Sequence, residues 1–577
     1  MGCGPDPVDS PLSLPTFLKK RDLVLAGILG LALFLRLVGI QFGLPHLYHA
    51  DEPMVVNHAL AYGMGDFNPH FFKIPPLVSY LLFAVYGLYF LGGRMLGFFR
   101  TPEDFEHLFY ADPSSFYLMG RFIFGVLMGT ATVYLLYRLI LKFFGPERAL
   151  LSALFLAVSF LHVRDSHYIY ADIPLVLVMV ATFFFLLSLV SSKKRLSLHL
   201  MSGVMIGLAT AAKYNGIALV FPYFYAVLFS GEKNRNFGFM VLAGLVALVT
   251  YFLLNPYSLL DFSFFWKEIT LQAKSQGGGG WTHHLKYSLI GGMGLPLFLF
   301  GLTGMVRALL RWDPARGAFT VFLLSYYAIL AFAAQPYDRY VLPLLPFLVF
   351  FAADFVIALA GRFKRHRPLI LGLFLGVLLL PPLVQSILFD RVMLARDTRT
   401  LAKEWVEKNI TSGSHLALGW DFYMPRLAFS KNQLLEKKEE VLRGEFHSRE
   451  RLRKLDHLLT HSSPTQPSYN LFFLMKASEK HSRFLFAQPV LPYDLGLLKD
   501  HGIDYVIVPR IHPHQEPRDF YDELSRRAEL VIEFNPYRNS ARKEAVDSQP
   551  LTGGPFLFRD LLLRKRNGQV IQIYRLK

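Results

Sequence analysis

The chain alternates between apolar blocks of membrane-spanning length and short clusters of basic residues. The clearest blocks are residues 23–40, 173–190 and 369–388. Each is close to the roughly 20 residues with which a helix crosses the hydrocarbon core of a bilayer. This pattern predicts an α-helical polytopic membrane protein.

The basic clusters predict the orientation of the spans, because lysine and arginine concentrate in cytoplasmic loops. The clusters are Lys19-Lys20-Arg21, residues 142–148, Lys193-Lys194-Arg195, and residues 233–235, 307–316 and 362–367. An even number of crossings must separate successive cytoplasmic clusters. The outer turns then lie near residues 162–172, 213–216, 255–286 and 335–339. Residues 1–21 are expected in the cytoplasm, and residues 22–389 form the membrane domain.

The segment between Arg21 and Lys142 contains three apolar blocks, and three crossings would invert every later loop. The middle block, residues 75–98, has the shortest apolar stretch and is followed by acidic residues. We therefore expect it to be a re-entrant or juxtamembrane helix inside a large first outer loop, residues 43–117. This arrangement gives eleven spans, and one hidden extra crossing would lead to thirteen.

Residues 390–577 are more charged, and their apolar runs are only as long as strands. Residues 416–418, 471–475 and 505–508 are expected strands, and residues 398–408 have helical periodicity. Residues 556–563 and 570–574 around Asn567-Gly568 predict a β-hairpin. This part is expected to be an α/β domain on the extracytoplasmic side.

Composition agrees with a membrane protein and excludes other classes. Of 577 residues, 53% are hydrophobic and only 18% are charged. The net charge of +17 could suggest nucleic acid. The basic residues, however, lie between apolar blocks, so membrane lipids and not nucleic acid are the expected partners. The single cysteine, Cys3, excludes an internal disulfide and a cysteine-based metal site.

Charged residues gather at the expected outer ends of the helices. Asp51 and Glu52 follow the first span, and Asp172 begins a later one. Charges at membrane depth are costly and tend to mark functional sites. Carboxylates with cations at one interface suit the displacement of an anionic lipid phosphate by a hydroxyl. The cations expected to bind such a phosphate are Lys73, Arg164, Lys213 and Arg339.

Plainer roles remain open for these residues. Asp51, Glu52 or Asp172 could cap a helix N-terminus, and Arg164, Lys213 or Arg339 could be interface anchors. A divalent cation held by Asp51 and Asp172, with a histidine, is also left open. The chain contains none of the glycine-rich loops that bind nucleotides, so no nucleotide cofactor is expected.

The order of several motifs resembles the GT-C membrane glycosyltransferases, in particular protein mannosyltransferases that use dolichyl-phosphate-mannose and bacterial aminoarabinose transferases of lipid A. These motifs are His49-Ala50-Asp51-Glu52, residues 68–77, Arg121 with Phe143-Phe144-Gly145, Asp172-Ile173-Pro174-Leu175, Lys213-Tyr214, and Arg339-Tyr340 with Leu342-Pro343. The resemblance covers about residues 20–390.

The resemblance implies a GT-C fold and a catalytic centre at Asp51, with Glu52 beside it. It also implies a sugar donor linked to polyprenyl phosphate and inversion at the anomeric carbon. The acceptor would be a hydroxyl of a protein, a glycolipid or another glycan, and the location the bacterial inner membrane. Which sugar is moved is not specified.

Two other functions compete with this one. A transporter or flippase of lipid-linked glycans would predict inverted repeats and ionisable residues at mid-span, whereas the candidates here lie at one face. A membrane scaffold would explain the C-terminal domain but not the charged outer loops.

Overall fold

The computed structural model describes residues 14–191, 196–230, 235–274, 280–331, 337–419, 423–443, 449–461, 466–475, 490–510, 517–538 and 557–576. The basic cluster Lys193-Lys194-Arg195 and residues 233–234 of the next basic cluster lie outside these ranges, as does Cys3.

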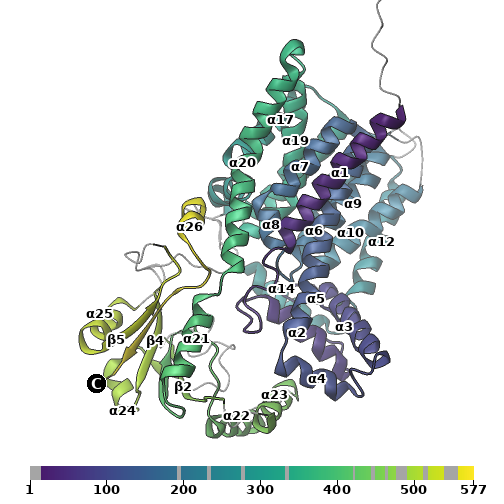
Figure 1. The fold of residues 1–577 in the computed structure, drawn as a ribbon. Coiled ribbons are helices and arrows are strands. Elements are labelled where there is room, and N and C mark those ends of the chain that lie inside the picture. Colours follow the sequence, from purple (N-terminus) through teal and green to yellow (C-terminus); the bar gives the residue numbers. More distant parts are fainter. Residues whose placement is uncertain are drawn as a thin grey trace, which may run out of the picture.

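A bundle of long apolar helices forms one half of the molecule, and a domain built on a β-sheet lies at one end of it (Figure 1). The helices of the bundle are α1 (Leu14–Leu37), α5 (Ser114–Gly120), η2 (Arg121–Leu127), α6 (Met128–Phe144), α7 (Pro146–Val158), α8 (Phe160–Asp165), α9 (Asp172–Ser191), α10 (Leu196–Ala212), η3 (Tyr214–Leu219), α11 (Val220–Leu228), α12 (Phe237–Leu254), α15 (Gly280–His283), η5 (His284–Leu289), α16 (Ile290–Met293), α17 (Leu295–Leu310), α18 (Pro314–Ala331), η6 (Asp338–Leu344), α19 (Leu345–Ala360), η7 (Lys364–His366) and α20 (Arg367–Leu394).

Seven helices among the described residues are long and apolar enough to cross a membrane, or eight if the bent pair around Gly294 is one span. The two halves of that pair, Gly280–Met293 and Leu295–Leu310, meet at 113°. Leu196–Ala212 and Tyr214–Leu228 are shorter apolar helices that meet at Lys213, where an outer turn was expected. Length and composition thus confirm a polytopic helical fold, while eleven to thirteen crossings remain a prediction.

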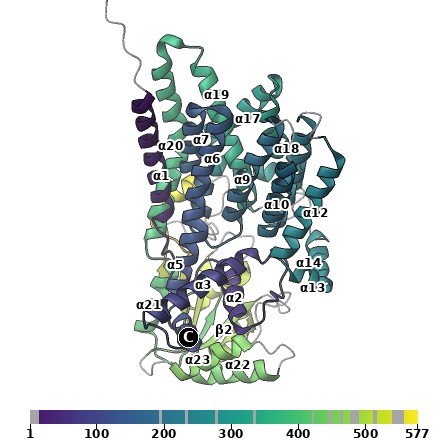
Figure 2. The same ribbon diagram turned by 90° about the vertical axis from the view of Figure 1, so that its right-hand side faces the viewer.

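The first-loop segment forms its own layer at the end of the bundle that faces the sheet domain (Figures 1 and 2). Its helices are α2 (Glu52–Ala61), η1 (Tyr62–Met64), α3 (Leu77–Met95) and α4 (Pro102–Ala111); α13 (Tyr257–Leu260) and α14 (Phe262–Lys274) lie at the same end. α3 is apolar enough to span a membrane by itself, yet it lies beside α2 and packs against it. A re-entrant or juxtamembrane position for α3 stays a prediction.

Basic clusters expected in the cytoplasm meet at the opposite end. Asp354 is buried and accepts hydrogen bonds from Arg148 (2.6 Å), Arg316 (3.0 Å) and Arg307 (3.3 Å). Arg367 also pairs with Glu147 at 2.7 Å. Three separate basic clusters therefore lie at one face, as the positive-inside pattern requires.

The C-terminal domain contains a six-stranded sheet of order β3-β2-β1-β4-β6-β5. The strands are β1 (His415–Leu418), β2 (Asn470–Met475), β3 (Val490–Pro492), β4 (Tyr505–Arg510), β5 (Glu529–Phe534) and β6 (Val570–Arg575), and the helices are α21 (Thr398–Asn409), α22 (Lys431–Arg443), α23 (Arg449–His461), α24 (Leu495–Asp500), α25 (Arg518–Arg527) and α26 (Leu557–Leu563). β1 to β4 pair in parallel, and β6 is antiparallel to β4 and β5. The three expected strands and the helix after residue 397 are confirmed.

The expected hairpin around Asn567-Gly568 is wrong. Residues 557–563 form helix α26, and β6 pairs with β4 and β5 instead. Asp560 accepts from Arg564 one helical turn later, at 2.5 Å, and Leu561 is buried. The i,i+4 ion pair and the buried leucine favour a helix over a strand that the apolar run alone would have suggested.

Candidate active site

In the segment before α2, His49 and not Asp51 caps the helix, which leaves the Asp51 carboxylate exposed. His49 Nδ1 accepts from the backbone N–H groups of Asp51 and Glu52, both at 3.3 Å. The Asp51 side chain makes no capping bond. Burial lowers the pKa of His49, so the ring is neutral and can act as this acceptor. The Asp51 carboxylate is therefore available for other contacts.

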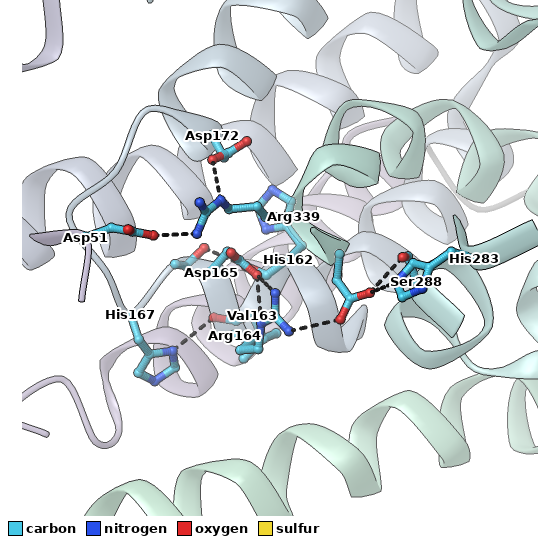
Figure 3. Close-up of polar contacts among 12 residues, drawn as sticks. Asp51, His162, Val163, Arg164, Asp165, His167, Asp172, His283, Ser288 and Arg339 are labelled. Carbon is cyan, nitrogen blue, oxygen red and sulfur yellow. Dashed lines mark hydrogen bonds and ion pairs between the residues drawn. The ribbon is translucent and has the colours of Figure 1, made fainter. Parts of the chain in front are cut away.

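Arg339, at the start of η6, lies between two carboxylates (Figure 3). Its Nη1 donates to Asp51 Oδ2 at 2.6 Å, and its Nε is 3.8 Å from Asp172 Oδ2. The rings of Tyr170 and Tyr337 lie 4.5 and 4.8 Å from the guanidinium carbon. Charge pairing and two aromatic faces thus fix the guanidinium in place.

Lys213 extends this arrangement from the break between α10 and η3. Its ammonium donates to Asp172 Oδ1 at 2.6 Å and lies 4.9 Å from the centre of the Tyr340 ring. Asp172 is the first residue of α9, where a carboxylate is favoured by the helix dipole. Carboxylates and cations therefore alternate in the order Asp51, Arg339, Asp172, Lys213, which we call the charge chain.

The electrostatics of the charge chain keep Asp51 ionised. Burial, the largest single effect, raises the pKa of Asp51, but the neighbouring charges, that of Arg339 foremost, together with the Arg339 hydrogen bond outweigh it and hold the pKa below its ordinary value. The Asp51 side chain is 32% exposed, against 12% for Arg339 and 3% for Asp172. Asp51 is thus the carboxylate of this group that an incoming molecule can reach.

Two atoms of the charge chain have unused hydrogen-bonding capacity. Arg339 Nε and Asp172 Oδ2 are buried, and within the described part of the chain neither has a hydrogen-bond partner. Buried polar atoms normally find partners. The free Nε–H donor is suited to a phosphate oxygen, with which it would form a charge-assisted hydrogen bond.

Glu52 lies apart from the charge chain. Its carboxylate is fully buried and receives two hydrogen bonds from Arg121, at 2.8 and 2.6 Å, and one from the backbone N–H of Ile169 at 3.0 Å. Arg121 also donates to the carbonyls of Ile40 and Phe42, both at 2.7 Å. The geometry gives Glu52 a positioning role: it ties the start of α2 to η2 and to the loop before Asp172.

Two of the expected phosphate-binding cations are not in contact with this group. Arg164 pairs with Asp165 at 2.8 Å and lies 3.9 Å from Asp338, which also accepts from Ser288 at 2.7 Å (Figure 3). Lys73 is exposed, and no contact among the described residues links it to the charge chain. Lys213 and Arg339 are the two cations that the fold brings to the carboxylates.

The sequence is compatible with a divalent cation held between Asp51 and Asp172. In the structure, the Arg339 guanidinium takes the place between these two carboxylates. The one group of three metal-ligating side chains among the described residues lies elsewhere, on α4 and α23.

Tyr170 and His49 are components of the site that the residue types alone did not reveal as such. Tyr170 lies two residues before Asp172 and stacks against both Arg339 and Lys213. Its position in the same charged outer loop was the signal that could have marked it.

Comparisons with known proteins show sequence similarity over part of the chain. A family model described as dolichyl-phosphate-mannose-protein mannosyltransferase matches residues 116–254. Dolichyl-phosphate-mannose–protein mannosyltransferase 1 of Saccharomyces cerevisiae is 29% identical over 230 residues, which is 37% of this chain and 26% of that protein. The chain thus aligns with about a quarter of that relative's length.

Two solved structures are similar over most of the chain. ArnT from Cupriavidus metallidurans in the apo state is 13% identical, with 96% of this chain and 98% of that chain covered and a TM-score of 0.47. The oligosaccharyltransferase AglB from Archaeoglobus fulgidus, in complex with an inhibitory peptide and a dolichol-phosphate, is 12% identical, with 85% and 70% covered and a TM-score of 0.49. The family model and the yeast relative share one description, which is that of the protein mannosyltransferases that the order of the motifs resembles.

Proposed function

We propose that this protein transfers a sugar from a polyprenyl-phosphate carrier to an acceptor hydroxyl on the extracytoplasmic side of the inner membrane. The observation that carries the proposal is the charge chain, in which one accessible carboxylate lies beside a buried arginine and lysine at the end of an apolar bundle. The matching family is described by its dolichyl-phosphate-mannose donor, a polyprenyl-phosphate sugar.

The donor phosphate would bind at Arg339 and Lys213. Arg339 has a free Nε–H directed into the group, and Nη1 already lies 2.6 Å from Asp51. A planar guanidinium that contacts a phosphate oxygen with one nitrogen and Asp51 with another places the base next to the reacting carbon. Lys213 adds a second charge that stabilises the phosphate as it leaves.

An apolar cavity offers a place for the lipid tail. It has a volume of about 470 Å³ and is lined by residues of η5, α16, α17 and α20 and by Phe558 of α26. Its lining includes Ile290 and Leu295 together with Leu380 and Val384 of α20. Ser288 lies two residues from Ile290 of this lining and donates to Asp338, the residue before Arg339. The segment that helps to line the cavity therefore also contacts the residue beside Arg339.

The chemistry follows from these positions. The acceptor oxygen forms a bond to the anomeric carbon while its proton passes to the Asp51 carboxylate. The bond between the anomeric carbon and the phosphate oxygen breaks, and its electron pair leaves with the polyprenyl phosphate. Attack from the face opposite the leaving group inverts the anomeric centre. The low pKa of Asp51 makes it a weak base, and the acceptor hydroxyl becomes acidic only as the new bond forms.

The proposal is tested by sugar transfer in membranes that contain the full chain. Radiolabelled sugars on polyprenyl phosphate are supplied, and label in protein and in glycolipid is counted separately. We expect transfer with the wild-type chain and a loss of about 10²–10⁴-fold with Asp51→Asn, the usual size of a general-base contribution. A residual rate within about tenfold of wild type would reduce Asp51 to a structural residue. Absence of transfer from every donor would favour a transporter or a scaffold.

A further inference from the structure

Three histidines from distant parts of the chain meet between the first-loop layer and the C-terminal domain. His107 belongs to α4, and His457 and His461 are one turn apart on α23. One potential ligand atom from each lies within 4.8 Å of the other two. The ring centroids are separated by 4.9, 4.7 and 4.5 Å. Neither the charge chain nor the proposed reaction uses this group.

We propose that His107, His457 and His461 form a Zn²⁺ site that fastens α4 to α23. Imidazole nitrogens are favoured zinc ligands, and three of them with one water complete a tetrahedral shell. At Zn–N distances of about 2.0–2.1 Å, the ligand atoms would be about 3.4 Å apart. The present spacing reaches that arrangement through small side-chain rotations.

The hydrogen bonds of the rings leave lone pairs for the ion. His461 Nδ1 lies 3.2 Å from the carbonyl oxygen of His457, so it donates there and Nε2 is free to bind metal. A ligating histidine normally donates its other N–H in this way. His107 Nδ1 and His457 Nδ1 are 2.8 Å apart. Without metal one must donate to the other, and with metal both lone pairs turn to the ion.

The carboxylate next to His107 in the sequence already has other partners. Glu106 is engaged with Arg453 at 3.0 Å and with the Tyr110 hydroxyl at 3.1 Å. Water is therefore the fourth ligand in this proposal.

The ion would supply the main connection between these two helices. Among the described residues, Arg453 and Glu106 also link the two helices; this pair is half-exposed, and such pairs contribute little. A shared ion, in contrast, binds only when His107 and α23 are together, so its binding free energy holds the first loop against the C-terminal domain.

The first test is metal binding by the full-length protein, purified in detergent through a tag without histidine and treated with chelator. ZnCl₂ alone is titrated, and bound zinc is counted by elemental analysis. We expect one tight site per chain, weakened by at least about 100-fold in His107→Ala and in His461→Ala, since loss of a supporting partner behind a ligand already costs 10- to 100-fold. His501→Ala is the matched control, because His501 Nδ1 likewise faces a carbonyl one turn away, at 2.8 Å. Equal zinc binding by wild type and His107→Ala would overturn the site.

The second test distinguishes a zinc ion that holds α4 against α23 from zinc bound elsewhere on the surface. Spin labels at Glu103→Cys and Thr460→Cys, with Cys3→Ser, report the separation of α4 and α23. Zinc should narrow the distance distribution in the labelled protein and leave it unchanged when His107→Ala is added. Bound zinc with an unchanged distribution of distances between the labels would show adventitious binding only, and would overturn the proposal that zinc holds α4 against α23.

Discussion

The Asp51 side chain is accessible because a neighbouring residue, His49, caps the helix in its place. An aspartate before a helix usually accepts from backbone N–H groups, and that role was one alternative for Asp51. Here His49 accepts those bonds, and the Asp51 carboxylate faces Arg339. The Asp51 carboxylate is therefore free of the capping role that its place before the helix suggests.

Substitution of Arg339 separates phosphate binding from simple anchoring. If the guanidinium contacts Asp51 and phosphate together, a point charge replaces it poorly. We expect Arg339→Lys to retain a minor fraction of transfer and Arg339→Ala to retain less, with unchanged protein levels. Wild-type transfer by the lysine variant would mean that Arg339 only anchors the helix end. Arg311→Lys, at the opposite face of the bundle, is the control.

The pH dependence of transfer reports the charge on Asp51. Its pKa is depressed, so the basic form is present above that pKa and is lost as pH falls through it. The acid limb due to Asp51 should lie below the ordinary aspartate value of 3.8. Arg339→Gln removes the charge that lowers this pKa and leaves burial, so the limb should move to higher pH. Measurement of kcat/KM against pH checks this, and an unmoved limb would contradict the assignment of Asp51 as base.

The sequence predicted the four members of the charge chain but not which of them contact one another. Asp51 and Arg339 are 288 positions apart, and their contact follows from the packing of helices that a single sequence does not specify. Charge at an outer loop was the whole signal, and it was equally strong for Arg164, Lys73 and Glu52. Arg164 pairs with its neighbour Asp165, and Glu52 with Arg121; burial and pairing of this kind distinguish structural charges from accessible ones.

At the scale of elements, the Glu52–Arg121 pair connects α2 to η2. η2 is a π-helix, a form found often at functional sites. The pair is fully buried, and removal of one partner leaves the other as an uncompensated charge. It therefore fixes the segment that carries Asp51.

We expect Glu52→Ala to destabilise the protein by about 3–5 kcal/mol, the usual result of breaking a buried ion pair. The change in stability is measured by heating the protein in detergent and detecting the folded fraction by size-exclusion chromatography. Asp66→Ala is the control, because Asp66 pairs with His70 on the surface and such a pair contributes at most about 1 kcal/mol. Equal stability of the two variants would mean that the buried pair does not hold α2.

Strong local patterns predicted elements well, and ambiguous ones did not. Residues 416–418, 471–475 and 505–508 are strands as expected, because each is a short apolar run within polar sequence. The run at 557–563 has the same character but forms α26, where the Asp560–Arg564 pair and contact with α20 decide the outcome. A short apolar run does not by itself distinguish the two forms.

At the scale of the molecule, the two ends of the bundle differ in chemistry. One end gathers basic clusters around Asp354, and the other carries the charge chain, the first-loop layer and the sheet domain. α1 begins at the end far from the sheet domain (Figure 1). This asymmetry is what a site on one side of a membrane requires.

Reporter fusions test that orientation. A reporter after Lys577 should be extracytoplasmic, and one inserted after Arg311 should be cytoplasmic, because the arginine cluster marks the inner face. Alkaline phosphatase activity marks the extracytoplasmic side and green fluorescent protein fluorescence the cytoplasmic side, each normalised to protein level. Both reporters on one side would contradict the map and the placement of the charge chain with it.

The proposed reaction breaks a bond to the lipid phosphate in a step that needs Asp51. The most direct measurement is a single turnover by the purified, reconstituted chain with a defined polyprenyl-phosphate sugar, in which freed polyprenyl phosphate and glycosylated acceptor are quantified together. We predict that the two products appear in equal amounts, that Asp51→Asn slows both by about 10²–10⁴-fold, and that Asp66→Asn leaves both unchanged. Donor that crosses the bilayer intact, with neither product formed, would contradict the account.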